Sequence, residues 1–340
     1  MTLQAVRAPV PPVGIVDSLA RGFEAVNSRL WLILLPLALD VFLWLGPRLS
    51  IERLLLRLSG LFPADLVSDP LFQRDLQEVF AQIVEAGGRF NLFSSLSTTP
   101  LGLPSLMAGR TPLANPFGLM LVVPVGSLAL YGLILVTLFL AGLFLGALFF
   151  DLAAGPLRES QISLGEWLRQ VMRKWARFSV LAALAVAAAL ILGIPLLLAI
   201  AFLGLLAPVL AQVIFVVAIT ILLWALLYVS FTPHGVVLGR QGIFAAAWDS
   251  IRMVQWSLPA AAGLLSVIVA LSWGLNYVWN LPGDDSWYLL LGAAGHAYVG
   301  TGLLVASFVF YKDRRRWWQE ARTQLIARAQ AERPGAGDQP

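Results

Sequence analysis

Six long runs of apolar residues, separated by polar or charged segments, dominate the pattern along the chain. A helix needs about 20 predominantly apolar residues to cross the ~30 Å hydrocarbon core of a bilayer. The runs that meet or approach this length are residues 30–45, 118–150, 178–207, 208–231, 259–281 and 288–311. The pattern therefore predicts an all-α fold, a polytopic membrane helix bundle of six transmembrane helices with interfacial amphipathic helices.

Turn signals divide and shape these runs. Residues 178–231 form a nearly continuous apolar stretch that is too long for one span, and we expect a tight turn at 204–208 between two helices. Gly193 and Pro195 predict a kink in the first of this pair. The run at 118–150 would be about 50 Å long as one helix, so we expect it to tilt, to bend near Pro124 or to project from the membrane.

Composition supports a membrane protein and narrows its partners. Hydrophobic residues make up 59% of the chain and charged residues 12%, whereas soluble domains average about 45–50% and about 25%. The net charge of +4 comes from basic residues beside apolar runs, which is typical of membrane topology and not of phosphate binding along a nucleic acid. We therefore expect no nucleic acid partner.

The placement of lysine and arginine predicts the orientation. Cytoplasmic loops are enriched in these residues. They gather in the 151–177 segment, in the loop after residue 231 and in the tail after residue 311, whereas the loop after residue 281 carries Asp284 and Asp285. We expect a multi-pass protein of the cell (cytoplasmic) membrane with both termini in the cytoplasm. Its parts would be a cytoplasmic segment at 1–29, a membrane domain at 30–311 and a cytoplasmic amphipathic tail at 312–340.

One outer segment, residues 47–117, is long enough to escape the charge rule. It holds two amphipathic stretches at 51–61 and 70–86, followed by a Pro/Gly/Ser-rich run at 93–117. We expect the last run to be irregular and packed on the outer surface of the bundle. The segment is either a structural cap or a lid for a ligand or protein partner.

An aromatic pair with seven intervening residues precedes spans 1, 3 and 5. Aromatic rings at headgroup depth, with cations toward an anionic cytoplasmic leaflet, are typical of interfacial helices. The pattern predicts three helix–span–span units, or it reflects the tendency of any inner-face helix to collect Trp and Arg. The tail offers a further anchor or a binding peptide for a cytoplasmic partner. The expected anchors are Phe23, Trp31, Trp167, Trp175, Trp248, Trp256, Trp317 and Trp318.

Small residues before span 5 carry a resemblance. Gly242, Ala246 and Ser250 are spaced as G-x-x-x-A-x-x-x-S, and Ser18 and Gly22 stand before span 1. In these positions the chain resembles uncharacterised bacterial multi-pass membrane proteins with cytoplasmic amphipathic-helix repeats. It is similar to the membrane domain attached to some glycerophosphodiester phosphodiesterases. The helix before span 3 lacks the pattern. The chain has no phosphodiesterase catalytic domain, so the resemblance implies a fold and no activity.

Motifs with a catalytic or metal-binding mechanism are missing from the sequence. It has no phosphate-binding G-x-x-x-x-G-K-[ST], no G-x-S-x-G, no H-E-x-x-H, no cysteine and only two histidines. We therefore expect no cofactor and no metal site, and an enzyme is the least favoured class.

Polar residues inside the apolar runs are the remaining candidates for chemistry. Asp40 lies in span 1, Asn276 and Asn280 lie one turn apart in span 5, and His296 lies in span 6. An ionisable residue at membrane depth is either functional or an interhelical hydrogen-bonding group. We expect Asp40 to face the bundle and to bond to groups on other spans, first of all span 5 or 6. Gly142 and Gly146 form a pair suited to close helix packing.

Two functional classes are compatible with these patterns. The first is a non-catalytic membrane scaffold, assembly or envelope-maintenance component that uses its outer segment or its tail for contacts. The second is a transporter or permease for a small or lipid-like substrate, with the four polar residues as its binding site. Broken helices and a cavity open to one side would favour the second class.

Overall fold

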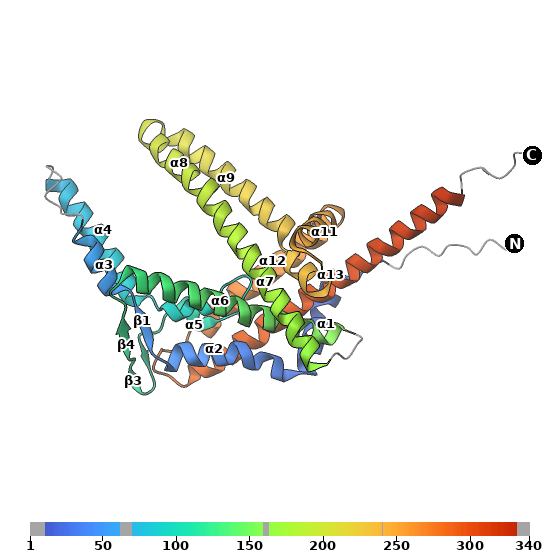
Figure 1. Cartoon of the computed structure of the whole chain (residues 1–340), viewed down its shortest axis with the longest axis horizontal. Helices are drawn as coiled ribbons and strands as arrows, with labels where there is room; N and C mark the ends of the chain where they lie inside the picture. Colours follow the sequence, from blue (N-terminus) through green and yellow to red (C-terminus); the bar gives the residue numbers. More distant parts are fainter. Residues whose placement is uncertain (1–10, 62–69, 159–162, 240, 332–340) are drawn as a thin grey trace, which may run out of the picture. The chain divides into compact units, whose positions relative to one another are not determined.

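The computed structural model describes residues 11–61, 70–158, 163–239 and 241–331, which are mostly helical (Figure 1). In this part of the chain five helices are long and apolar enough to cross a membrane, or six if a bent pair is counted as one. They are Leu128–Leu157, Leu164–Leu206, Pro208–Leu238, Leu258–Trp279 and Tyr288–Gln324. The predicted class, a helical polytopic membrane protein, fits these elements. Parts of the predicted end segments, residues 1–10 and 332–340, lie outside the described residues.

The chain forms two compact units. We call residues 26–196 and 268–301 the loop unit, because it contains the outer segment, and residues 1–25, 197–267 and 302–340 the tail unit. Each unit is described by itself.

The first apolar run is broken into short pieces. Helix α1 (Ile15–Asn27) ends before the run, a 3-10 turn, η1 (Leu30–Ile33), opens it, and helix α2 (Leu34–Leu45) completes it. With about 2.0 Å per residue in η1 and about 1.5 Å in α2, the two extend about 26 Å. This is somewhat short of the ~30 Å hydrocarbon core, so the length of these two elements alone does not make the run a sixth crossing.

The second span starts later than predicted. Residues 118–124 form strands β3 (Gly118–Leu119) and β4 (Val122–Pro124), and helix α6 runs over Leu128–Ala154 before a 3-10 turn, η4 (Gly155–Leu157). Gly118 has φ +118°, and Pro124 lacks the N–H that a helix would use. The 27 residues of α6 are about 40 Å long, so the predicted span 118–150 is corrected to a shorter, regular helix.

The interfacial helix predicted before span 3 is not a separate element. Helix α7 (Leu164–Ala188), a π-helical turn η5 (Ala189–Gly193) and helix α8 (Ile194–Leu206) follow one another without a gap. Ser163 caps the start by accepting from the Glu166 N–H, and no Gly or Pro interrupts residues 166–192. The π turn lies where the kink was predicted, since Pro195 lacks an N–H for the regular pattern.

The turn predicted at 204–208 is present, because α8 ends at Leu206 and helix α9 (Pro208–Val229) begins after Ala207. Short helix α10 (Thr232–Leu238) follows. Helix α11 (Ile243–Trp256) is separate from α12 (Leu258–Trp279), as the repeat predicts. Helix α13 (Tyr288–Ala331) is continuous over 44 residues. The described part of the tail, residues 312–331, therefore continues the helix of residues 288–311, and its role as an anchor or a binding peptide stays a prediction.

Both amphipathic stretches of the outer segment are helices. They are α3 (Glu52–Ser59) and α4 (Pro70–Arg89), and a Cβ on Gly87 would lie 2.1 Å from Leu55 Cδ1. Strand β1 (Arg48–Ser50) pairs in parallel with β4, with Arg48 opposite Val122. Arg48 Nη2 donates to the carbonyls of Gly88 (2.6 Å) and Arg89 (2.8 Å) at the end of α4. Burial lowers the pKa of this guanidinium, which stays charged because an arginine titrates far above neutrality.

The rest of the outer segment divides into a part that packs along α6 and a short hairpin. It contains a 3-10 turn η3 (Leu92–Leu96), helix α5 (Leu106–Arg110) and strand β2 (Ala114–Asn115), which pairs with β3. Residues 92–110 pack along the middle of α6, where a Cβ on Gly146 would lie 2.0 Å from the Leu101 carbonyl oxygen and one on Gly142 2.6 Å from that of Leu96. Gly146 lies about 27 Å along α6 from Leu128. We call residues 92–110 the inserted segment.

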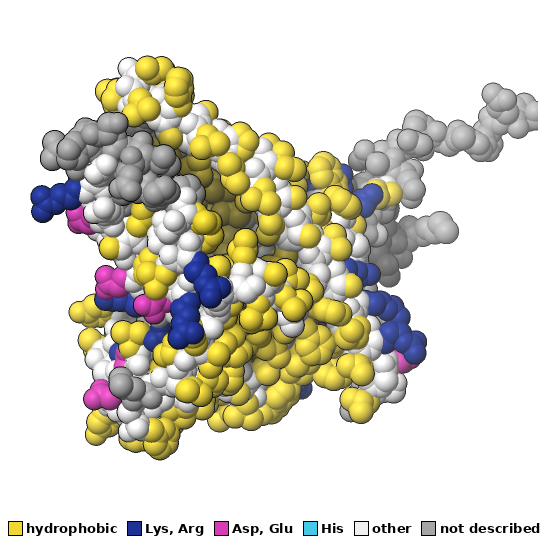
Figure 2. Space-filling view, turned by 60° about the vertical axis from the view of Figure 1, so that its left-hand side comes forward, with side chains coloured by type: hydrophobic (Ala, Val, Ile, Leu, Met, Phe, Trp, Pro, Cys, Tyr) yellow, Lys and Arg dark blue, Asp and Glu magenta, His cyan; other side chains and the backbone are white. Residues whose placement is uncertain are grey.

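Large hydrophobic side chains cover much of the exterior. Figure 2 shows them over most of the face in view, with charged side chains gathered in a few places. Helices α8 and α9 are the extreme case: Leu198 is 65% exposed and Leu222 54%. Exposed apolar patches of more than a few hundred Å² are rare in soluble monomers. These helices have the surface that a lipid environment or a partner helix would cover.

Candidate functional site

Asp40 of α2 closes the N-terminus of α5 in the loop unit. Its side chain is fully buried. Oδ1 accepts from Ser105 Oγ (2.5 Å) and from the Met107 N–H (3.0 Å), and Oδ2 accepts from the Leu106 N–H (3.2 Å). Ser105 Oγ in turn accepts from the Ala108 N–H (3.0 Å). The four N-terminal N–H groups of a helix lack intrahelical partners, and here Asp40 and Ser105 together satisfy three of them.

This geometry corrects the expected partner of Asp40. The carboxylate is buried and hydrogen-bonded, because a charge that is removed from water needs such partners. Its partners, however, belong to the inserted segment and not to span 5 or 6. Pro104, directly before Ser105, lies against α13, since a Cβ on Gly300 would be 3.0 Å from Pro104 Cβ. The inserted segment thus contacts α2, α6 and α13 within one unit.

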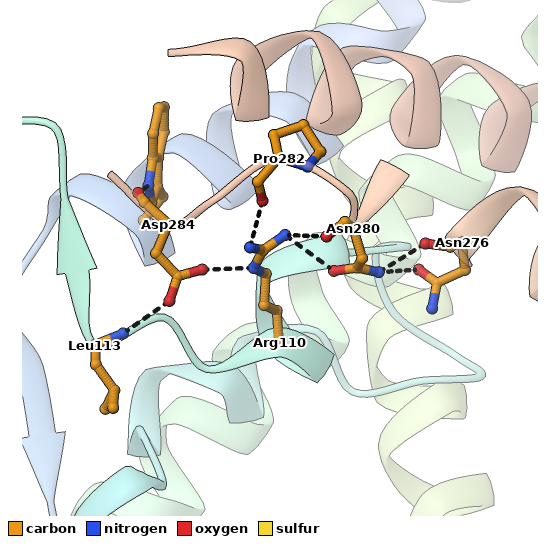
Figure 3. A network of polar contacts seen from close by, with 7 residues as sticks. Arg110, Leu113, Asn276, Asn280, Pro282 and Asp284 are labelled. Carbon is orange, nitrogen blue, oxygen red and sulfur yellow. Dashed lines mark hydrogen bonds and ion pairs between the residues drawn. The ribbon is translucent and has the colours of Figure 1, made fainter. Parts of the chain in front are cut away.

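Arg110, the last residue of α5, is the centre of a second polar network (Figure 3). Its Nε donates to Asp284 Oδ1 at 2.6 Å. Its Nη1 donates to the Asn280 carbonyl at 3.1 Å, and its Nη2 donates to the Pro282 carbonyl at 2.5 Å. The planar guanidinium therefore donates to one carboxylate and to two backbone carbonyls that follow α12.

The network continues on both sides of Arg110 (Figure 3). Asn280 Nδ2 donates to the Asn276 carbonyl (2.8 Å) and to Asn276 Oδ1 (3.1 Å). Asp284 Oδ2 accepts from the Leu113 N–H at 3.4 Å, and the Asp284 carbonyl accepts from Trp44 Nε1 at 2.8 Å. These bonds fasten the loop between α12 and α13 to α2 and to the outer segment.

The four candidate polar residues are divided among three places. Asn276 and Asn280 meet in the Arg110 network, and Asp40 binds α5. His296 is half-buried in α13, with Nδ1 buried and without a hydrogen-bond partner among the described residues. No hydrogen bond between described residues joins the three places.

The sequence analysis did not predict a buried charge cluster that lies near the C-terminal end of α6. The Asp151 carboxylate, 1% exposed, pairs with Lys174 and Arg158 and accepts from Trp167 Nε1 at 2.8 Å. Asp151 is the one acid in residues 118–157 and precedes a Lys/Arg-rich segment. A single acid at that place in an apolar run is the sequence feature that could have indicated an ion pair. Trp167, an expected anchor, is therefore a hydrogen-bond donor to a buried carboxylate.

His234 of α10 was also missed. It is buried in the tail unit, and its Nε2 lies 2.7 Å from Ser307 Oγ. Its ring centroid is 4.5 Å from that of Phe308 and 5.4 Å from that of Phe231. This histidine packs among aromatic rings as part of the core, and the sequence around it gives no sign that it is buried.

The spaced small residues form packing faces. Ser250 Oγ donates to the Tyr228 carbonyl (2.7 Å) and accepts from the Phe231 N–H (3.1 Å). Ala246 is fully buried, as is Ser18 of α1. A Cβ on Gly22 would lie 2.6 Å from the Ala306 backbone nitrogen of α13. These positions therefore allow close helix approach within the tail unit.

The remaining expected anchors fall into two groups. Trp31, Trp248 and Trp256 are 50%, 55% and 71% exposed. Phe23, Trp175, Trp317 and Trp318 are half-buried. Trp175 Nε1 donates to the Leu140 carbonyl at 3.0 Å, which binds α7 to α6. The exposed group can reach a headgroup layer, and the other group contributes to packing.

Asp40 and Arg110 each use their hydrogen bonds to hold one segment of the chain against another. In the described ranges no three His, Cys, Asp or Glu side chains gather where they could hold a metal ion. Comparisons of the chain with protein families, with curated proteins and with solved structures found no match. The resemblance to the phosphodiesterase-attached membrane domain therefore stays a prediction.

Proposed function

We propose that the protein is a non-catalytic membrane scaffold, an assembly or envelope-maintenance component that presents a rigid outer surface to a protein partner. The observation that carries this proposal is the use of Asp40, the one carboxylate in the first apolar run, to cap α5 of the inserted segment. Its hydrogen bonds hold chain segments together, and the Arg110 network does the same with the loop after α12.

The outer hairpin supplies a surface for such a partner. Phe117, between β2 and β3, is 77% exposed, and Leu121 is 70% exposed. Phe117 is at the turn of the β2–β3 hairpin, and Leu121 follows this hairpin directly before β4. We call residues 114–121 the outer hairpin; the β1–β4 pair and the Leu113 N–H bond to Asp284 anchor it. Large apolar side chains held on an ordered support are typical of interaction sites.

We place this scaffold in the cell membrane with six spans and both termini in the cytoplasm. The support for this orientation is the excess of Lys and Arg in residues 151–177 and in the tail, against Asp284 and Asp285 at the opposite end of the spans.

The scaffold proposal is tested by site-specific photo-cross-linking in intact cells that produce the full chain. A photo-reactive residue at Phe117 or Leu121 should give one discrete adduct with another protein. The matched control is Leu133 of α6, which is 66% exposed within a span and should give lipid adducts only. Lipid adducts alone at Phe117 and Leu121 would contradict a partner at the outer hairpin.

A transporter is the second candidate, and the inserted segment favours it. Irregular backbone at membrane depth occurs where it is buried in protein or lines a water-filled path. Ser97, which is 5% exposed, donates to the Leu103 carbonyl at 2.7 Å. Transport would require this segment to move and water to reach Ser97 from one side, whereas a scaffold would keep Ser97 dry. Thiol labelling of a Ser97→Cys variant distinguishes the two.

A further inference from the structure

Helices α11 and α13 enclose a small recess within the tail unit. Its volume is about 50 Å³, where one water needs roughly 10–15 Å³ on this measure, so a group of four or five heavy atoms fits. Arg252 of α11 and Arg314 and Arg315 of α13 line it, together with Asp249, Tyr311 and Trp318. Its lining therefore carries three arginines against one carboxylate.

Arg314 is the unusual member of this group. It is 7% exposed, yet its Nε and Nη1 are buried with no hydrogen-bond partner among the described residues. Its Cζ lies 3.9 Å from the centroid of the Phe310 ring, which attracts the cation but provides no acceptor for the Nε and Nη1 donors. Burial of a guanidinium whose donors lack acceptors lowers the stability of the fold, and an anion in the recess would supply those acceptors.

A neighbour of Arg314 also lacks a hydrogen-bond partner. The Tyr311 hydroxyl, which lines the same recess, is also buried without a hydrogen-bond partner in the described part of the chain. Asp249, the one acid in the lining, already accepts from Gln241 Nε2 at 2.7 Å and lies 3.7 Å from Arg315 Nη2. Its charge therefore acts on Arg315, and in the described part of the chain it forms no ion pair with Arg314 or Arg252. The Asp313 carboxylate, next to Arg314 in the sequence, partly balances that guanidinium but accepts no hydrogen bond from its Nε or Nη1.

We propose that this recess binds the phosphate group of an anionic ligand, with Arg314 as the principal donor, Tyr311 as a neutral donor and Arg252 at the entrance. Arginine matches phosphate because its planar fork offers two parallel N–H bonds to two oxygens. Trp318 in the lining and Trp248, over which Arg252 lies at 5.1 Å, are residues typical of headgroup depth. The site is independent of the proposed scaffold function.

The test measures saturable binding to the full chain in bilayer nanodiscs of phosphatidylcholine. One arm adds phosphatidylglycerol, and the other adds inorganic phosphate. Binding of phosphatidylglycerol alone identifies a lipid headgroup as the source, and equal binding of inorganic phosphate identifies a soluble anion. Either result supports a phosphate site if Arg314→Gln weakens it at least tenfold.

Arg316→Gln is the matched control, because Arg316 is exposed on the same helix and pairs with Glu320 at 2.9 Å. It should bind like the wild type. Arg252→Gln, at an exposed position, should weaken binding severalfold and keeps the test decisive if Arg314→Gln does not fold. Failure of both probes to saturate the wild type, or equal effects of the Arg316→Gln and Arg252→Gln variants, would overturn the proposal.

Discussion

At the scale of single residues, the loop unit contains two buried carboxylates, Asp40 and Asp151, that are stabilised differently. Asp151 pairs with two cations, whereas Asp40 is held by one hydroxyl and two backbone N–H groups. Hydrogen bonds to a charged group contribute about 1.5–3 kcal/mol each. The Asp40 site therefore depends on hydrogen-bond geometry, and a change of side-chain chemistry there should be felt at α5.

We expect Asp40→Asn to destabilise the protein by about 1–2 kcal/mol, since one acceptor oxygen replaces two. Asp40→Leu should cost about 3 kcal/mol or more, because it leaves the Leu106 and Met107 N–H groups buried and unpaired. Unfolding in mixed micelles, followed by circular dichroism, measures both. Asp285→Asn, at an exposed aspartate, is the control and should stay within about 0.5 kcal/mol. An Asp40→Leu variant as stable as this control would show that the cap does not hold α5.

The need for a partner at Asp40 could be predicted from the sequence, and the identity of the partner could not. A carboxylate four residues after Pro36 in an apolar run must find donors. Ser105, however, lies in a segment without helical or strand periodicity, so no pattern indicates how deep it packs. The same holds for Arg110, whose partners are backbone carbonyls that carry no sequence signal.

At the scale of elements, breaks are predictable where Gly or Pro supplies them. The turn before Pro208 and the distortion before Pro195 follow from missing N–H groups. The continuity of α7 is different, because a change from polar to apolar residues suggested a boundary at about residue 177. A helix can continue through such a boundary, because its backbone hydrogen bonds do not depend on whether the side chains are polar or apolar.

Gly142 and Gly146 were predicted to permit close packing, and their partner is the inserted segment. We expect Gly146→Ala to destabilise the protein by about 2–3 kcal/mol, because its Cβ would lie 2.0 Å from the Leu101 carbonyl oxygen, and overpacking of this kind costs about 1–3 kcal/mol. Gly132→Ala, in the same helix with nothing within 4 Å, should be neutral or stabilising by up to about 1 kcal/mol. Melting temperatures of the two purified variants test this, and equal shifts would contradict the close approach.

At the scale of the whole molecule, composition predicts the class, because 59% hydrophobic and 12% charged residues leave too little polar surface for a soluble chain of this length. The division into two units and the depth of the inserted segment could not be predicted in this way. Both depend on contacts between residues far apart in the chain, such as Leu101 with Gly146 and Ser105 with Asp40.

The proposed topology predicts a labelling pattern in this naturally cysteine-free chain. Single cysteines at Leu121 and Asp285 should react with a membrane-impermeant maleimide in intact cells. Cysteines at Gln241 and Glu320 should react only after the membrane is opened, and Ser97→Cys only after denaturation. The rates of modification decide it. In the six-span arrangement five spans separate Leu121 from Glu320, so reaction of both from the same side would contradict it. Ser97→Cys reacting in native membranes would favour the transporter.

The cap between Asp40 and Ser105 also has a consequence for biosynthesis. The two residues are 65 positions apart, and a ribosome adds about 5–20 residues per second. The donors for the carboxylate therefore emerge about 3–13 s after it. In the proposed six-span topology, the first apolar run therefore carries an unpaired carboxylate during this interval and must wait at the insertion machinery or keep that group in contact with water. Its final position is fixed only when the inserted segment arrives, so a longer insertion between residues 47 and 104 would extend the period in which the nascent chain is exposed to quality control.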